Sequence, residues 1–235
     1  MSLRRAWLAC LLAAGTPLAS AGPAAERYVL KSFPADGQGS RLEETVSADY
    51  VFDPSGVTYS SRMVSERRVE EVVIRTDPEA RLIEARRRVL DAQGREASSE
   101  TISVKGEVAQ VRRLVKGRTR SSTIPLKPGM EPAADASLLL LLRREALSAG
   151  LRKRYFMIDF SGRSVTVTAA GLGIETLDVP AGRFDCARIE VTVDVPILKP
   201  RITYWLSATS PHFLVQHHGK RGPFTRTFTT VLVGN

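Results

Sequence analysis

The chain has 235 residues, of which 43% are hydrophobic and 25% are charged, and these values are ordinary for a globular protein. They exclude a disordered chain and a protein that crosses a membrane several times. Lysine and arginine number 34 against 25 aspartates and glutamates, which gives a net charge of +9. With 2 cysteines and 3 histidines, the sequence offers neither a disulfide framework nor a cluster of histidine and cysteine metal ligands.

The first 21 residues have the pattern of a secretory signal peptide. A short basic segment, residues 1–5, precedes the apolar run 6–15, and Ala19-Ser20-Ala21 supplies the small residues of a cleavage site. The apolar run is shorter than the ~20 residues that cross a bilayer, so no transmembrane segment is expected after cleavage. We predict cleavage before Gly22, a periplasmic location and a single β-rich domain over residues 22–235.

The next segment shows the alternation of apolar and polar side chains that half-buried β-strands have. The runs 42–52, 57–63 and 69–75 each place apolar residues on one parity, and Asp53-Pro54-Ser55-Gly56 forms a turn between the first two. Further turn signals recur every ~11–17 residues as far as Lys116-Gly117, which is the spacing of an antiparallel meander.

Residues 77–92 are compatible with two structures. Asp77 as N-cap, Pro78 at the first helical position and Gly94 beyond the end favour a helix. Turn signals bracket the segment at the same spacing as its neighbours, and this favours a strand. We predict a strand.

Residues 135–149 form the clearest helical segment. Asp135 or Ser137 is placed to cap its N-terminus, and Gly150 is placed to end it. The five successive leucines 138–142 cover nearly all sides of the helix, so it must be buried on more than one side. We expect the helix to pack on or in the concave side of a curved sheet.

The strand pattern returns after the helix in the runs 154–160, 164–170, 172–179, 183–195, 201–207, 213–218 and 224–233. Roughly a dozen strands are too many for a flat sheet that neither curls nor closes. The predicted fold class is therefore mainly β: an antiparallel meander that forms a strongly curved sheet or barrel, with one leucine-rich helix.

Several short motifs accompany the helix and the strands that follow it, namely Asp135-x-Ser137, Leu142-Arg143, Gly150, Glu175-Thr176, Val179-Pro180-Ala181-Gly182-Arg183-Phe184, Tyr204-Trp205-Leu206-Ser207, Pro211 and Leu214-Val215. In these motifs the chain resembles a family of exported Gram-negative bacterial β-proteins known only as a domain of unknown function. The resemblance covers about residues 130–233 and implies a curved antiparallel sheet or barrel in the cell envelope. It implies no catalytic residue, because the family has none established.

Eight residues are candidates for lining a ligand site or holding the fold. Pro180 and Gly182 form a turn between two strands, after which Phe184 and Cys186 share one sheet face. Cys186 is expected to be a free, buried thiol, with an intermolecular disulfide as the alternative. Trp205 is expected in the core or at its rim rather than as a stacking platform for a ligand. The full set is Leu139, Leu142, Pro180, Gly182, Phe184, Cys186, Trp205 and Pro211.

The sequence predicts no catalytic site, no cofactor and no metal. His217 and His218 are adjacent on a strand and point to opposite faces, and His212 lies too far along the chain to join either. No Gly-x-Ser-x-Gly motif marks a hydrolase nucleophile. Nothing beside Cys186 would lower the pKa of its thiol.

The positive charge gathers in residues 67–120, which hold arginine at twelve positions. Alternation along strands distributes these arginines mostly over solvated outer faces. For an exported protein, an anionic envelope component such as a phosphorylated lipid headgroup or an acidic glycan is the expected partner of a positive surface, and nucleic acid is not.

Three hypotheses follow for function. The first is a non-enzymatic protein whose curved sheet encloses an apolar cavity that binds a lipid or another amphiphile. The alternative is an envelope scaffold with a filled core that meets a protein partner through a sheet edge or its basic face. The third, an enzyme that acts on envelope polymers, is the least favoured, and we expect no enzyme. A solidly packed interior would separate the first hypothesis from the second.

Overall fold

The structure is a computed structural model that describes residues 24–35, 43–148, 150–195, 199–220 and 227–234. The expected signal peptide and its cleavage site lie outside these residues. The described elements are β1 (Ala24–Pro34), β2 (Glu44–Asp53), β3 (Gly56–Val64), β4 (Arg68–Thr76), β5 (Leu82–Asp91), β6 (Glu96–Lys105), β7 (Val108–Val115), β8 (Arg118–Pro125), β9 (Glu131–Ala133), α1 (Asp135–Glu145), β10 (Arg152–Ile158), β11 (Ser164–Val179), β12 (Gly182–Val193), β13 (Arg201–Ser207), β14 (Leu214–Lys220) and β15 (Thr227–Gly234).

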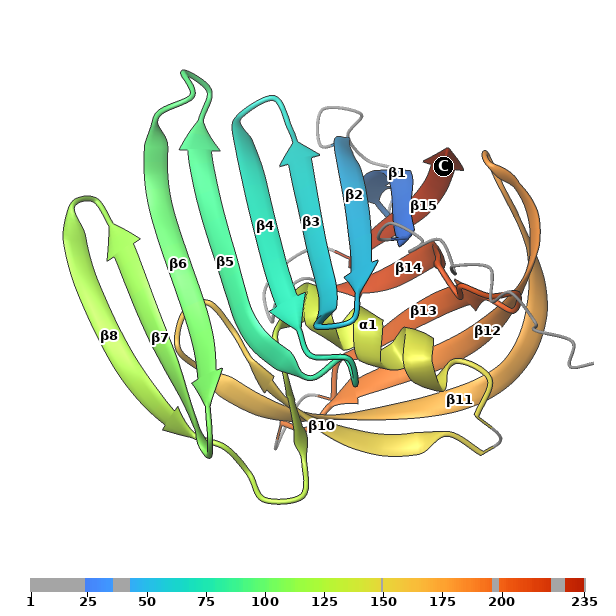
Figure 1. Ribbon diagram of the computed structural model, residues 1–235. Helices are drawn as coiled ribbons and strands as arrows, with labels where there is room; N and C mark the ends of the chain where they lie inside the picture. The colour runs from blue at the N-terminus through green and yellow to red at the C-terminus, as the bar shows by residue number, and fades with distance from the viewer. Residues whose placement is uncertain (1–23, 36–42, 149, 196–198, 221–226, 235) are drawn as a thin grey trace, which may run out of the picture.

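The strands form one sheet in the order β8-β7-β6-β5-β4-β3-β2-β1-β15-β14-β13-β12-β11-β10-β9. Neighbouring strands run antiparallel, except that β9 and β10 are parallel. β1 pairs with β15, so the first and last described strands lie side by side in the middle of the sheet (Figure 1). Within the described residues β8 and β9 have a strand neighbour on one side only, so the sheet is curved but not closed. The predicted fold class is confirmed, with 15 strands rather than a dozen.

Helix α1 lies on the concave side of this sheet (Figure 1). Its leucines 138–142 are all buried, with none more than 7% exposed, as a helix that is apolar on all sides requires. The N-cap residue is Ala134 rather than Asp135, and Ser137 holds the first turn because its hydroxyl accepts a hydrogen bond from the Ala134 N–H at 2.7 Å. The helix ends at Glu145, four residues earlier than predicted. Among the described residues, no helix combines the length and the apolar character needed to cross a membrane.

The ambiguous segment 77–92 is a turn followed by strand β5, so the strand prediction is confirmed. Asp77 has the capping chemistry of a helix N-terminus, but its carboxylate accepts a hydrogen bond from the Arg81 N–H at 2.8 Å and closes a hairpin turn instead. Leu82 and Ala85 then bury their side chains in the core. Asp91 makes the same contact to the N–H of Arg95, so one turn design serves both ends of β5.

The prediction of separate strands 164–170 and 172–179 is wrong, because β11 is one strand of 16 residues. At the break between the two predicted strands lies a β-bulge, where the register with β12 shifts between Gly171 and Gly173. Gly173 has φ of +108°, which a residue with a side chain rarely adopts. The predicted turn after this strand is present, and Pro180 and Ala181 join β11 to β12.

Candidate functional site

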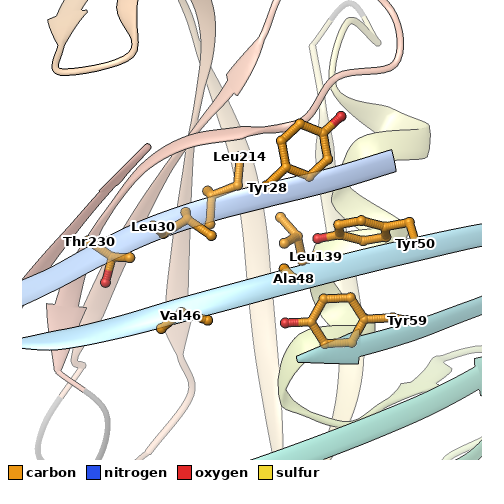
Figure 2. Close-up of a pocket in the computed structure, with 9 residues that line it drawn as sticks. All are labelled: Tyr28, Leu30, Val46, Ala48, Tyr50, Tyr59, Leu139, Leu214 and Thr230. Atoms are coloured by element: carbon orange, nitrogen blue, oxygen red, sulfur yellow. The ribbon is translucent and has the colours of Figure 1, made fainter. Parts of the chain in front are cut away.

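A small cavity lies between helix α1 and the concave face of the sheet (Figure 2). Its volume is about 80 Å³. Ligand pockets for small molecules are usually ~300–1,000 Å³, and a cavity of ~150 Å³ holds benzene. The space therefore admits a few water molecules or a very small fragment, but not an acyl chain. Its lining comes from strands β1, β2, β3, β14 and β15 and from the helix: Tyr28, Leu30, Val46, Ala48, Tyr50, Tyr59, Leu139, Leu214 and Thr230.

The polar groups of this cavity are mainly tyrosine hydroxyls. Figure 2 shows the hydroxyls of Tyr50 and Tyr59 pointing the same way, toward the space beside Ala48, whereas the hydroxyl of Tyr28 points away from it. Burial raises the pKa of Tyr50 well above its usual value, so its phenol stays protonated at neutral pH. The rings of Tyr50 and Tyr59 pack with centroids 4.9 Å apart. The protonated phenol of Tyr50 can donate a hydrogen bond to a small guest, but it cannot serve as a base.

Arg143 of helix α1 forms a nearly buried ion pair beside the cavity. Its Nη2 lies 2.7 Å from the Glu26 carboxylate on β1, and the side chains are 7% and 18% exposed. The Nε and Nη2 groups also donate to the Pro211 carbonyl, at 3.0 and 2.8 Å. The guanidinium stacks 4.6 Å from the centroid of the Tyr50 ring. Arg143 thus fastens the helix to β1, to β2 and to the loop before β14.

The predicted residue Phe184 lies close to this ion pair through a chain of aromatic contacts. Phe213 stacks on Tyr28 with ring centroids 5.2 Å apart. The Phe213 ring also meets the ring of Phe184 edge-on, with centroids 5.6 Å apart. The Pro180–Gly182 turn reaches the same end of the molecule, where the Ala181 N–H donates to the Leu232 carbonyl at 3.3 Å. The structure therefore gathers Phe184, the turn and the Pro211 loop at one end of the sheet.

Cys186 and Trp205 form a separate small cluster with Val215. They share the sheet face opposite to Ala187 and Leu206, which belong to the main core. The indole N–H of Trp205 donates to the Glu175 carboxylate. Burial, with the nearby charges of Asp185 and Glu175, raises the pKa of Cys186 to about 11, so the thiol is a poor nucleophile. Cys186 is free, and Trp205 is buried rather than presented as a platform.

The histidines are held by local partners. His212 Nδ1 lies 2.9 Å from the Ser207 carbonyl, and His218 Nδ1 lies 3.0 Å from the hydroxyl of Thr229. The ring of His217 packs against Tyr204 with centroids 4.9 Å apart. Within the described ranges, no three His, Cys, Asp or Glu side chains come together as a metal site.

Of the eight predicted residues, Leu139 lines the cavity, whereas Leu142 is fully buried in the core. Glu26, Tyr28 and Tyr59 are absent from the predicted set although they shape this site. The sequence held a signal for Tyr50 and Tyr59, because each shares a parity with the apolar residues of its strand. Glu26 gave none, since its partner lies 117 residues away.

No family model matches the chain, and no curated protein matches it either. Similar solved structures include a hypothetical lipoprotein, YmcC, from Escherichia coli (K12), which is 15% identical over 88% of this chain and 87% of that chain, with a TM-score of 0.39. A protein from Bacteroides fragilis, described as exported and with a YmcC-like fold, is 17% identical over 88% of this chain and 93% of that chain, with a TM-score of 0.32.

A protein from Parabacteroides distasonis, described as a lipoprotein, is 13% identical over 88% of this chain and 93% of that chain, with a TM-score of 0.33. With TM-scores this low, these likenesses support no conclusion about the location or function of this chain. The resemblance to a family of exported β-proteins therefore stays a prediction.

Proposed function

We propose that this chain is a non-enzymatic binding protein of the bacterial cell envelope, with a filled interior and a partner that it meets on its surface. The predicted signal peptide supports the location. The alternative of a lipid carrier requires an interior that can receive an acyl chain.

The observation that carries the proposal is the position of helix α1. Its five leucines occupy the concave side of the sheet, and the space left beside Leu139 is about 80 Å³. Pockets that enclose a drug-sized ligand are several times larger. The helix is also tied down by the Arg143–Glu26 pair, so vacating the interior would break a buried ion pair.

The chemistry of the interior supports a role other than catalysis. Burial keeps the phenol of Tyr50 and the thiol of Cys186 protonated at neutral pH, so neither acts as a base or a nucleophile. The carboxylate of Glu26 accepts hydrogen bonds from Tyr28 at 2.9 Å and from Arg143 at 2.7 Å. These groups hold one another in place and leave little reactivity for a substrate.

A titration with a dansyl-labelled fatty acid tests the proposal, with Leu139→Trp as the matched variant that fills the cavity. We expect that Leu139→Trp does not reduce any saturable binding of the fatty acid, because the interior does not receive it. One-to-one binding by the unmodified protein that is lost in Leu139→Trp would establish an interior site and overturn the proposal. Binding that both proteins keep would place the fatty acid outside the core, in agreement with the proposal.

A further inference from the structure

The concave face of the sheet changes character at its open end, in the β7–β8 hairpin. Val111 and Ile124 belong to the main core, and their side chains lie on the concave face. Two residues further toward the tip, the same face carries Arg113 on β7, directly opposite Arg120 on β8. The next pair on this face is Val115 and Arg118. The apolar core therefore gives way to arginines as the hairpin leaves the body of the sheet.

A hollow of about 460 Å³ lies at the tip of this hairpin, and it is far larger than the cavity beside the helix. Its lining consists of Arg113, Val115, Lys116, Arg118 and Arg120. The lining residues all lie at the tip of the β7–β8 hairpin, and β8 is an edge strand of the sheet (Figure 1).

The cations of the hollow lack carboxylate partners among the described residues. The arginines of strand β5, which lies two strands from β7, differ, because each has a carboxylate within 3.1 Å: Arg86 with Glu84, Arg87 with Glu100 and Arg88 with Glu96. Like charges placed directly opposite one another destabilise a strand pair. The pair Arg113 and Arg120 therefore costs stability unless an anion lies between the two guanidiniums.

One polar atom of the hollow is left unsatisfied. Arg113 Nε is buried and has no hydrogen-bond partner among the described residues. Its cross-strand neighbour Glu100 is the nearest carboxylate by register, but that group is 2% exposed and accepts from Arg87 Nε at 3.1 Å. A buried donor without an acceptor costs free energy, and an anionic oxygen would remove that cost.

We propose that Arg113, Arg118 and Arg120, with Lys116 at the rim, form a binding site for a phosphoryl group. A phosphoryl group presents two non-bridging oxygens in a diester, or three in a monoester, that accept hydrogen bonds, and the planar guanidinium of arginine matches two of them at once. A monoester phosphate, with three such oxygens and a larger charge, satisfies more of these donors than a single carboxylate does. The phosphoryl group comes either from a phospholipid headgroup or from a soluble phosphate ester. This proposal rests on the proposed function, because it names the surface at which the protein would meet its partner.

The experiment measures two kinds of binding with the mature protein. One arm is sedimentation with vesicles of phosphatidylcholine containing phosphatidylglycerol, against vesicles of phosphatidylcholine alone. The other arm is calorimetric titration with inorganic phosphate and with glycerol 3-phosphate. The test variant is Arg113→Gln/Arg120→Gln, and the matched control is Arg86→Gln/Arg88→Gln, which removes the same charge from the opposite sheet face. Circular dichroism verifies that both variants fold.

We expect the test variant to bind about tenfold more weakly than the unmodified protein, because two charge-assisted contacts are lost, and the control to change little. Binding of the anionic vesicles alone identifies a lipid headgroup, and binding of the soluble phosphates identifies a free ester. Equal losses of binding in the test variant and the control would show that net charge alone causes the binding. That result would overturn the proposed site. Absence of binding in both arms would overturn it too. An interior fatty-acid site would instead overturn the proposed function and leave this result unaffected.

Discussion

Arg143 of helix α1 and Glu26 of strand β1 form an ion pair of 2.7 Å that ties the helix to the middle of the sheet, where β1 meets β15. The two residues are 117 positions apart, and Arg143 also donates to the carbonyl of Pro211. A buried charge needs such partners, because burial without them is strongly unfavourable. The pair therefore fixes where the leucine-rich helix lies, and with it how much of the interior is filled.

Removal of one partner of this pair should destabilise the protein strongly. Arg143→Met leaves the Glu26 carboxylate partly buried with only Tyr28 as donor, and we expect a loss of about 3 kcal/mol in the free energy of unfolding. Urea denaturation at neutral pH measures the loss. The control is Arg27→Met on the same strand, whose partner Asp49 and own side chain are exposed. A change in Arg143→Met as small as that in the control would show that the pair does not hold the helix.

The leucines of the helix should be as sensitive as any core position. Leu141 is fully buried, so Leu141→Ala should lower the free energy of unfolding by about 3 kcal/mol through lost burial and a new cavity. Leu147 lies just beyond the helix and is 53% exposed, so Leu147→Ala should have an effect below about 0.5 kcal/mol. Thermal and urea unfolding compare the two. Similar losses would mean that α1 is not packed in the interior.

The thiol of Cys186 should react slowly in the folded protein. With the pKa raised to about 11, only about one thiol in a thousand is ionised at pH 8, and the group is buried as well. A disulfide reagent such as dithionitrobenzoate should therefore label the native protein far more slowly than the protein in denaturant. Labelling at equal rates in the two conditions would show that the thiol is exposed.

The same pKa shift predicts how stability changes at alkaline pH. The pKa of Cys186 is raised from 9.0 to about 11 on folding, so the folded protein holds this proton more tightly than the unfolded chain does. Its contribution is fully present below pH 9 and is lost as the pH rises from 9 to 11. The unmodified protein should therefore lose more stability than Cys186→Ala over this interval, as measured by urea unfolding at each pH. Parallel pH profiles would contradict the shift, because other titrating groups are common to both proteins.

Local sequence patterns predicted the strands and the helix because burial acts on each element directly. The parity of Ala48 and Tyr50 placed both side chains inward, and both are buried. The run of leucines required a helix covered on several sides, and the curved sheet provides that cover. The division of β11 into two predicted strands is wrong at Gly171 and Gly173, where a β-bulge continues the strand.

The candidate sites depend on pairings between distant segments, and these were not predictable from local patterns. The contact of Glu26 with Arg143 joins strand β1 to a helix 117 positions further along the chain, and the alternation of side chains does not specify such a contact. The arginines at 113 and 120 were expected on solvated outer faces. The register of β7 with β8 puts them opposite one another on the concave face, beyond the end of the core. To predict that arrangement, one must know toward which face the sheet curves.

The most direct test of a filled interior is native mass spectrometry, with organic extraction, of the protein purified from the periplasm of its host. We predict the mass of the chain cleaved before Gly22, with no amphiphile in the extract at a one-to-one ratio. A reproducible amphiphile that co-purifies at this ratio with the unmodified protein, and is absent from the Leu139→Trp variant, would contradict the account and make the protein a carrier.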